Sequence, residues 1–262
     1  MPNIEAAVRT HIGTIRANNE DNFYLNGVTM RIDQLNAGGL FQANSADKLQ
    51  LYAVCDGMGG LGCGEQASTL AAKNLDAVKP IGMRKFPKRL VQYIAETGRE
   101  ICALQEGGKL AGTTLAMTYF SKNKVRVANI GDSRVYFKRL SNQLTLVTKD
   151  HTQAQWFVEQ GMITSEQAET HSSRNALRRF IGTPESMEID NSPYVLDAMR
   201  IKVGDMFLIC SDGLSEAIGI DEMDNTLSYE RSCSDISKTL VTLAIKNKAK
   251  DNVTAMVLKV LQ

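Results

Sequence analysis

Three apolar runs in this sequence each lead into an aspartate, an arrangement that could hold a metal ion beside a substrate. Asp56 follows LYAVC and precedes a burst of glycines, Asp212 follows FLICS, and Asp132 follows VANIG. Two more carboxylates lie near the ends of the chain, where Asp251 stands just before the run VTAMVLKV and Asp21 follows RANNE. A carboxylate at the end of a buried strand, with glycine beside it, leaves room for an ion to approach.

Carboxylates of this kind favour a hard divalent cation. If strands ending at Asp56, Asp212 and Asp251 converge, their charges repel one another unless a cation lies among them. The sequence has no His/Cys cluster, which disfavours zinc, and oxygen ligands suit magnesium or manganese. Two such ions roughly 3.5–4 Å apart could bridge one water and lower its pKa. The resulting hydroxide would be suited to in-line attack on phosphorus.

Each of these residues also has an ordinary explanation. An Asp-Gly pair after a strand is usually a turn. Asp132 could pair with Arg134, and Asp251 could cap a turn with Asn252. Arg16 could be an exposed surface charge.

The glycines after the first aspartate allow a second interpretation. Gly57, Gly59 and Gly62 match the G-x-G-x-x-G spacing of a dinucleotide-binding loop between a strand and a helix. However, Asp56 would face the pyrophosphate, and the region about 20 residues on, AVKPIG, lacks the required carboxylate. Both features disfavour a nucleotide site, and the absence of GK[ST] excludes a Walker loop.

Composition narrows the class of protein. The chain has 262 residues and a formal net charge of +1, which argues against a general nucleic-acid binder. No apolar stretch reaches the ~18 residues of a membrane span, and the N-terminus lacks a signal-peptide pattern. Five cysteines without a CxxC pair favour reduced thiols. We therefore expect a cytoplasmic protein that binds neither nucleic acid nor membrane.

The elements that must position the aspartates are mostly strands. Short apolar runs predict strands near 51–55, 114–120, 124–130, 134–139, 143–148, 206–210 and 253–260. Several are separated by only a few residues, so the middle of the chain is predicted to be antiparallel. The polar segment 29–48 is predicted to be an extended hairpin or surface loop.

Helical periodicity occupies other segments. Apolar stripes predict helices over 65–78, 86–104 and 234–246. The stripe of the second helix consists of Leu90, Val91, Ile94, Ile101 and Leu104. Helices grouped between strand runs indicate helices packed outside an antiparallel core.

Eight motifs in order carry a family resemblance: RANNED (16–21), VCDGMGG (54–60), AGTTL (111–115), NIGDSR (129–134), TKDHT (148–152), RNALRRFIG (174–182), CSDGL (210–214) and DNVT (251–254). Together they resemble the metal-dependent protein phosphatase family, protein phosphatase type 2C, in its bacterial branch. The resemblance implies an α+β, four-layer sandwich, in which two central antiparallel β-sheets are flanked by pairs of α-helices. It also implies a single catalytic domain over 1–262 with a small helical flap at about 150–182, where Thr164 or Ser165 could cap a helix.

The resemblance implies a metal centre. Asp56 would bridge two ions, Mn²⁺ or Mg²⁺, and the Gly57 carbonyl would bind one of them. Asp212 and Asp251 would complete the shell of the first ion. Asp132 would face a third ion of the kind found in bacterial members.

The resemblance assigns roles to two further residues. Asp21 would hold a water molecule bound to metal, and Arg16 would receive the substrate phosphate, a role that suits a guanidinium fork. Some family members carry a proton-donating histidine where Met58 stands. Methionine cannot donate a proton, so the resemblance leaves that step to water.

The implied function is hydrolysis of phosphoserine and phosphothreonine in proteins, by attack of a metal-bridging water and without a phosphoenzyme. The implied partners are phosphorylated proteins and a cognate Ser/Thr kinase with its substrates, and we expect a monomer. Two alternatives stay open: a non-catalytic pseudophosphatase that binds phosphoproteins or kinases, and a dedicated phosphatase of anti-sigma antagonists.

Overall fold

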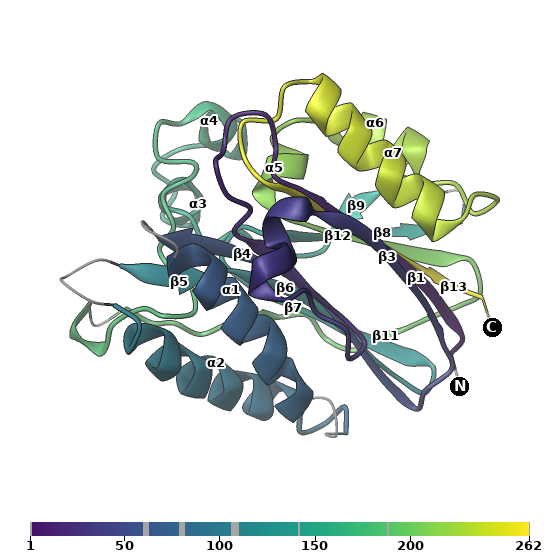
Figure 1. Ribbon diagram of the computed structural model, residues 1–262, viewed down its shortest axis with the longest axis horizontal. Helices are drawn as coiled ribbons and strands as arrows, with labels where there is room; N and C mark the ends of the chain where they lie inside the picture. The colour runs from purple at the N-terminus through teal and green to yellow at the C-terminus, as the bar shows by residue number, and fades with distance from the viewer. Residues whose placement is uncertain are drawn as a thin grey trace.

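Two antiparallel sheets lie face to face in the computed structural model, with helices on their outer faces (Figure 1). The structure describes residues 2–59, 63–78, 82–105, 110–140, 142–187 and 189–261. The predicted four-layer α+β architecture is confirmed. Gly62, part of the glycine pattern considered above, lies outside the described residues.

One sheet has six strands in the order β3-β1-β13-β12-β8-β9. Its strands are β1 (Ile4–His11), β3 (Gly39–Ser45), β8 (Arg134–Arg139), β9 (Thr145–Leu146), β12 (Asp205–Cys210) and β13 (Val253–Val260). The two ends of the chain pair inside this sheet, because β1 and β13 run antiparallel from Ile4 opposite Val260 to His11 opposite Val253.

The other sheet has seven strands. Its main path is β10-β7-β6-β4-β2, with β11 paired to β7 and β5 paired to β4. Its strands are β2 (Asp21–Leu25), β4 (Leu49–Gly59), β5 (Ala111–Thr113), β6 (Leu115–Ser121), β7 (Lys124–Ile130), β10 (Tyr194–Val195) and β11 (Met199–Arg200). Consecutive strands β6 and β7 form a hairpin, as the sequence predicts.

The strands are apolar on both faces because both faces are covered. Leu51, Ala53 and Cys55 of β4 pack in the layer under the helices. Tyr52 and Val54 of the same strand pack in the layer between the sheets. Side chains alternate across a strand, so burial of both faces turns β4 into the continuous apolar run that precedes Asp56.

Helices cover each outer face. Over the seven-stranded sheet lie α1 (Cys63–Asn74), its continuation η2 (Leu75–Ala77) and α2 (Phe86–Cys102). Over the six-stranded sheet lie α5 (Asp212–Ser215), α6 (Ile220–Thr226) and α7 (Cys233–Lys246). The apolar stripe predicted for α2 is wrong at Val91, which is 49% exposed, whereas Leu90, Ile94 and Ile101 are buried. Val91 directly follows Leu90, so it lies about 100° around the helix from that residue, outside the face that packs on the sheet.

Two short helices form the predicted flap, α3 (Gln153–Glu159) and α4 (Ser165–Thr170). Thr152 caps the first helix, because its side chain accepts from the Gln155 N–H. Thr164 caps the second in a capping box with Gln167. The prediction of a cap at Thr164 or Ser165 is therefore correct, with Thr164 as the capping residue.

The segment 29–48 differs from its prediction in part. It contains the 3-10 helix η1 (Ile32–Ala37) and the regular strand β3, which pairs with β1 along the sheet edge. A further 3-10 turn is η3 (Glu185–Met187), and the strand predicted over 143–148 contracts to β9.

Candidate active site

Five aspartates from separate elements meet at one end of the sandwich. Asp56 lies in β4 directly opposite Asp21, the first residue of β2. Asp132 follows the last residue of β7 by two positions, Asp212 begins α5 after β12, and Asp251 precedes β13 by two positions. The structure thus brings together every carboxylate that the sequence singled out.

The charge of each buried carboxylate acts on the others. Burial raises the pKa of Asp56 well above its usual range, and the charges of Asp21, Asp212, Asp132 and Asp251 raise it further. Burial likewise raises the pKa of Asp132 well above its usual range, with Asp212 adding to the effect. Carboxyl groups whose pKa is raised in this way either stay protonated or ionise next to a bound cation.

Asp21 is held rigidly below the surface. It is fully buried, and its Oδ2 accepts hydrogen bonds from Ser211 Oγ at 2.7 Å and Thr254 Oγ1 at 2.6 Å. Its Oδ1 has no hydrogen-bond partner among the described residues. Burial raises the pKa of Asp21 to about 7 despite these two donors.

Asp212 also presents a buried oxygen without a partner. Its Oδ1 makes no hydrogen bond within the described part of the chain. Burial, followed by the charges of Asp251 and Glu216, raises the pKa of Asp212 to about 6. Two buried carboxylate oxygens without partners at one end of the sandwich fit a site for a hard cation.

The backbone beside Asp56 leaves no room for a side chain at position 57. A Cβ on Gly57 would lie 2.2 Å from the Gly64 carbonyl oxygen and 2.7 Å from that of Glu20. The Asp56 carbonyl oxygen accepts from the Thr114 N–H at 2.8 Å and from Thr113 Oγ1 at 2.9 Å. These bonds fix the strand, and the glycine lets neighbouring chain segments close around it.

Arg16 lies at the mouth of this acidic centre and contacts one of its members. Its Nη2 is 2.6 Å from Asp251 Oδ2, and its side chain is 52% exposed. The other carboxylate oxygen of Asp251 accepts from the Asn252 N–H at 2.8 Å. Arg16 is thus not an isolated surface charge, and Asp251 does make the local turn contact considered above.

The alternative explanation of Asp132 does not hold. Arg134 instead forms a bidentate contact with Asp150, with Nη2 to Oδ2 at 2.6 Å and Nε to both oxygens at 3.1 Å. Asp132 therefore forms no ion pair with Arg134, although the positive charge of Arg134 opposes the rise in the pKa of Asp132.

Sequence reasoning missed several residues that support the centre. Ser211 and Thr254 lie within the motifs CSDGL and DNVT but were given no role. Glu65 was not considered, although its buried Oε2 has no partner among the described residues. Burial and the charge of Glu65 raise the pKa of Glu20 to about 7. Polar residues inside otherwise apolar strand ends are the signal that could have revealed them.

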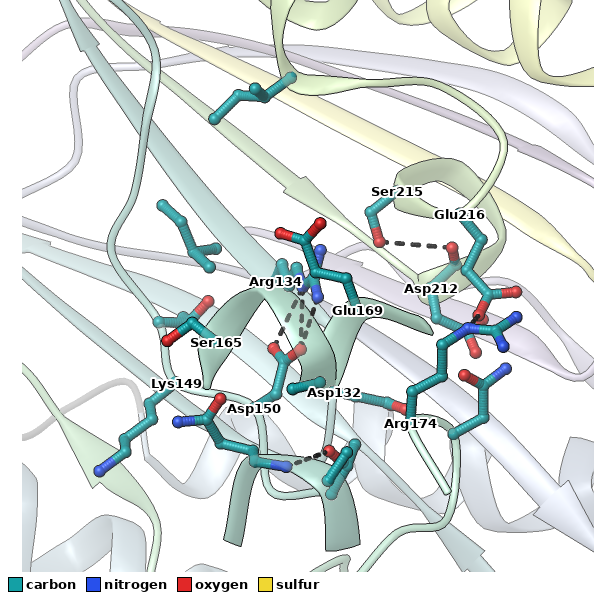
Figure 2. A pocket seen from close by; sticks show the side chains of 18 of the residues that line it. Asp132, Arg134, Lys149, Asp150, Ser165, Glu169, Arg174, Asp212, Ser215 and Glu216 are labelled. Carbon is teal, nitrogen blue, oxygen red and sulfur yellow. Dashed lines mark hydrogen bonds and ion pairs between the residues drawn. The ribbon is translucent and has the colours of Figure 1, made fainter. Parts of the chain in front are cut away.

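A cavity of about 760 Å³ opens beside the acidic centre, between the flap helices and α5 and α6 (Figure 2). Asp132 and Asp212 form part of its wall. In Figure 2 Arg134 points at Asp150, and Arg174 lies beside Glu216, with Nε to Oε1 at 3.6 Å. A phosphorylated segment could thus reach the aspartates alongside the flap.

The donor set suits Mn²⁺ or Mg²⁺ by its chemistry. It consists of carboxylate oxygens, two of them buried without partners, with strongly raised pKa values around them. Among the described residues, no three His, Cys, Asp or Glu side chains already stand as a complete coordination shell. Both oxygens of Asp251 are engaged, one by Arg16 and the other by the Asn252 N–H.

The chain is similar to known proteins over most of its length. The family model for protein phosphatase 2C matches residues 26–253. The serine/threonine phosphatase stp of Listeria welshimeri is 30% identical over 264 residues, covering 98% of this chain and 96% of the relative. PstP of Mycobacterium tuberculosis is 32% identical over 257 residues, covering 96% of this chain and 44% of its own.

Solved structures show the same similarity. The crystal structure of the M. tuberculosis phosphatase PstP/Ppp superposes with a TM-score of 0.80 at 29% identity, covering 99% of this chain and 100% of that one. The catalytic domain of PstP in complex with two manganese ions gives a TM-score of 0.78 at 28% identity, with complete coverage of both chains. Across the described residues, we find no helix with the length and apolar character needed to cross a membrane.

Proposed function

The chain belongs to the protein phosphatase 2C family, and from that premise we infer that it is a serine/threonine phosphatase that hydrolyses phosphoserine and phosphothreonine in proteins. The observation that carries the inference is the meeting of Asp21, Asp56, Asp132, Asp212 and Asp251 at one end of the sandwich. A pseudophosphatase would not need buried, mutually repelling carboxylates, and the set is complete here.

The proposed cofactor is a pair of Mn²⁺ or Mg²⁺ ions. When bound, they would polarise a water molecule and neutralise charge on the phosphoryl group, the chemistry that phosphomonoester hydrolysis needs. Asp56 would contact both ions, and the Gly57 carbonyl oxygen would contact one of them. Asp212 and Asp251 would supply the remaining protein ligands of the first ion. Asp132 would face a third ion.

Two hydrogen bonds fix the orientation of Asp21 in this proposal. Ser211 and Thr254 donate to one carboxylate oxygen, which leaves the unpartnered Oδ1 to accept a proton from water at the centre. Because the residue is fully buried, its orientation is fixed before substrate arrives.

Arg16 binds the phosphate in this proposal. Its guanidinium now pairs with Asp251, a ligand that the ions would also claim. With Asp251 engaged by the metal site, Arg16 would be free to offer two parallel N–H donors to the phosphate oxygens. Metal binding and phosphate binding would thereby support each other.

The proposal also covers the substrates, the cellular location and the oligomeric state. The substrates would be phosphorylated proteins of a cognate Ser/Thr kinase, and the enzyme would act as a cytoplasmic monomer with one domain over 1–262. A single anti-sigma antagonist as substrate is the narrower version of the same activity.

A panel of phosphopeptides tests the proposal. Matched peptides carrying phosphoserine, phosphothreonine or phosphotyrosine are incubated with the metal-stripped protein, then with added Mn²⁺, then with chelator. We expect release of phosphate from the first two peptides only with Mn²⁺. Turnover in chelator, or a strong preference for phosphotyrosine, would overturn the proposed activity.

A further inference from the structure

A second cavity lies at the opposite end of the sandwich from the aspartates. Its volume is about 510 Å³. It is lined by Pro2, Lys122, Asn123, Ile201, Lys202, Val203 and Val260. Strands β7 and β12 begin beside it and end beside the acidic centre, and their six to seven residues span roughly 20 Å. The cavity is therefore a separate place on the molecule.

The walls of this cavity are fixed by the backbone. The Ile201 N–H donates to the Asn123 carbonyl oxygen at 3.0 Å, which joins the β6–β7 turn to the segment before β12. The Gly204 N–H donates to the Val260 carbonyl oxygen at 2.9 Å, which joins that segment to the end of β13. A cavity built in this way needs little ordering when a ligand enters, and that favours binding.

Two lysines line the cavity, and two further cations lie near it. Lys122 and Lys202 line it, and just outside it Arg200 stands directly opposite Lys124 in the β11–β7 pair. All four residues are exposed, and in the part of the chain described they form no ion pair. Like charges opposite each other on adjacent strands destabilise the pairing, so an external anion would relieve the repulsion.

The one carboxylate at this end of β12 is already engaged. Asp205 is fully buried, and its two oxygens accept from Arg139 at 2.8 Å each. It cannot turn toward Lys202, although the Lys202 backbone N–H donates to it at 2.9 Å. Among the described residues, Asp205 is therefore not available to pair with the lysines that line the cavity.

Between the cations the lining is apolar. Ile201, Val203 and Val260 contribute aliphatic side chains, and Val203 is 53% exposed. An aliphatic or aromatic side chain placed here would cover Val203, which removes apolar surface from water. The site thus combines an apolar socket, formed by Ile201, Val203 and Val260, with the positive charges of Lys122 and Lys202 beside it.

We propose that this cavity binds an acidic peptide segment of a partner protein, with an apolar side chain in the socket and carboxylates against the four cations. Lys122 lies in the β6–β7 turn and Lys202 in the segment before β12, whereas Lys124 and Arg200 lie in the paired strands β7 and β11. Charges spread in this way match an extended peptide better than a compact anion. Three of them are lysines, which act as point charges without the fork that captures one phosphate. The proposal does not depend on the phosphatase activity.

Fluorescence anisotropy with a labelled peptide tests this proposal. The probe carries one leucine flanked on each side by glutamates. Two control peptides replace the leucine with serine or the glutamates with lysines. We expect the full-length protein to bind the probe about tenfold more tightly than either control peptide, because each control lacks one half of the chemistry.

Matched variants locate the binding. Lys122→Glu combined with Lys202→Glu should weaken probe binding by about tenfold or more, and Val203→Ser should weaken it to a smaller extent. Lys85→Glu combined with Lys88→Glu makes the same charge change on α2 and should leave binding unchanged. Hydrolysis of p-nitrophenyl phosphate should be unaffected in all three variants.

Three results would overturn the proposal. The first is equal binding of the serine-substituted peptide, which would indicate attraction to polyanions alone. The second is equal loss in the α2 control. The third is binding to phosphatidylserine vesicles without binding to the probe, which would make the surface a membrane contact.

Discussion

Strand β12 has one aspartate at its start and another just past its end, and the two carboxylates differ in their partners. At the start, Asp205 is fully buried and accepts a bidentate pair of bonds from Arg139. Beyond the end, Asp212 has a buried oxygen without a partner among the described residues. One carboxylate receives its countercharge from the chain itself, whereas the other is left to obtain one from outside.

The difference separates structural charge from functional charge. A buried charge without a partner costs several kcal/mol, so it persists only where something else compensates it. In the proposed function the acidic end receives its countercharge from a bound cation, while the basic end of the same strands exposes its cations to water at little cost. Large effects of substitution should concentrate at the acidic end.

The largest expected effect comes from Asp56→Asn. Loss of the carboxylate proposed to contact both ions should lower Mn²⁺-dependent hydrolysis of p-nitrophenyl phosphate by on the order of 10²–10³-fold or more. The variant should stay folded, because it removes a mutually repelling charge. Asp205→Asn is the matched control: it should lower the free energy of unfolding by about 1–3 kcal/mol and keep kcat. Equal losses of activity in Asp56→Asn and Asp205→Asn would contradict the distinction between a functional charge at the acidic end and a structural charge at the other end.

The stability of the metal-free protein should depend on pH in an unusual direction. Unfolded carboxyls release their protons near pH 4, whereas in the fold Asp21 and Asp212 hold theirs until about 7 and about 6. The folded state binds more protons between pH 4 and 7, so raising the pH lowers the free energy of unfolding, on the order of a few kcal/mol.

Urea unfolding in chelator at pH 5 and pH 7.5 checks this dependence. His151 acts in the opposite sense, because burial lowers its pKa to about 4 and its contribution is lost as pH falls from about 6.5. The difference between wild type and Asp212→Asn removes that background. A wild type no more pH-sensitive than Asp212→Asn would show that the carboxyl is not perturbed.

A smaller effect should follow from the hydrogen bond between Thr254 and Asp21. Thr254→Val keeps the shape but removes the donor at 2.6 Å from Asp21 Oδ2, and we expect Mn²⁺ affinity to fall by roughly 10–100-fold. Thr254→Ser restores the hydroxyl and should recover most of the affinity. If Thr254→Val and Thr254→Ser bind Mn²⁺ with the same affinity, residue 254 contributes packing and its hydroxyl does not orient Asp21.

The smallest of these effects should come from Arg16→Ala. Arg16 is half exposed, so its loss should raise KM for phosphopeptides by about tenfold and change kcat little. Arg16→Lys keeps the charge without the fork and should give an intermediate KM. An unchanged KM in Arg16→Ala would count against phosphate binding by this residue.

Much of the fold could be predicted because buried strands leave a plain pattern. The bounds of β7, β8 and β13 match the predicted runs, since each is bounded by a turn or a polar motif. Strand β1 escaped prediction because its sequence IEAAVRTH mixes charge with alanine. Its side chains become core only when β13, from the other end of the chain, pairs with it.

The candidate site was predictable in its members and not in its contacts. The motifs identified all five aspartates, because each stands at a fixed place beside an apolar run. No local pattern could place Arg16 against Asp251, 235 positions away, or Ser211 and Thr254 on Asp21. Those contacts exist only after the two sheets have closed on each other.

Calorimetric titration of the metal-stripped protein with Mn²⁺ at pH 7.5 is the most direct test of the central claim that the buried carboxylates obtain their countercharge from divalent cations. For wild type we predict saturable binding, accompanied by a rise in unfolding free energy of about 2.7 kcal/mol at a free Mn²⁺ concentration one hundred times Kd. Asp56→Asn should lose the binding, and Asp205→Asn should keep it. Absence of binding to wild type, or the same binding in Asp56→Asn, would contradict the account.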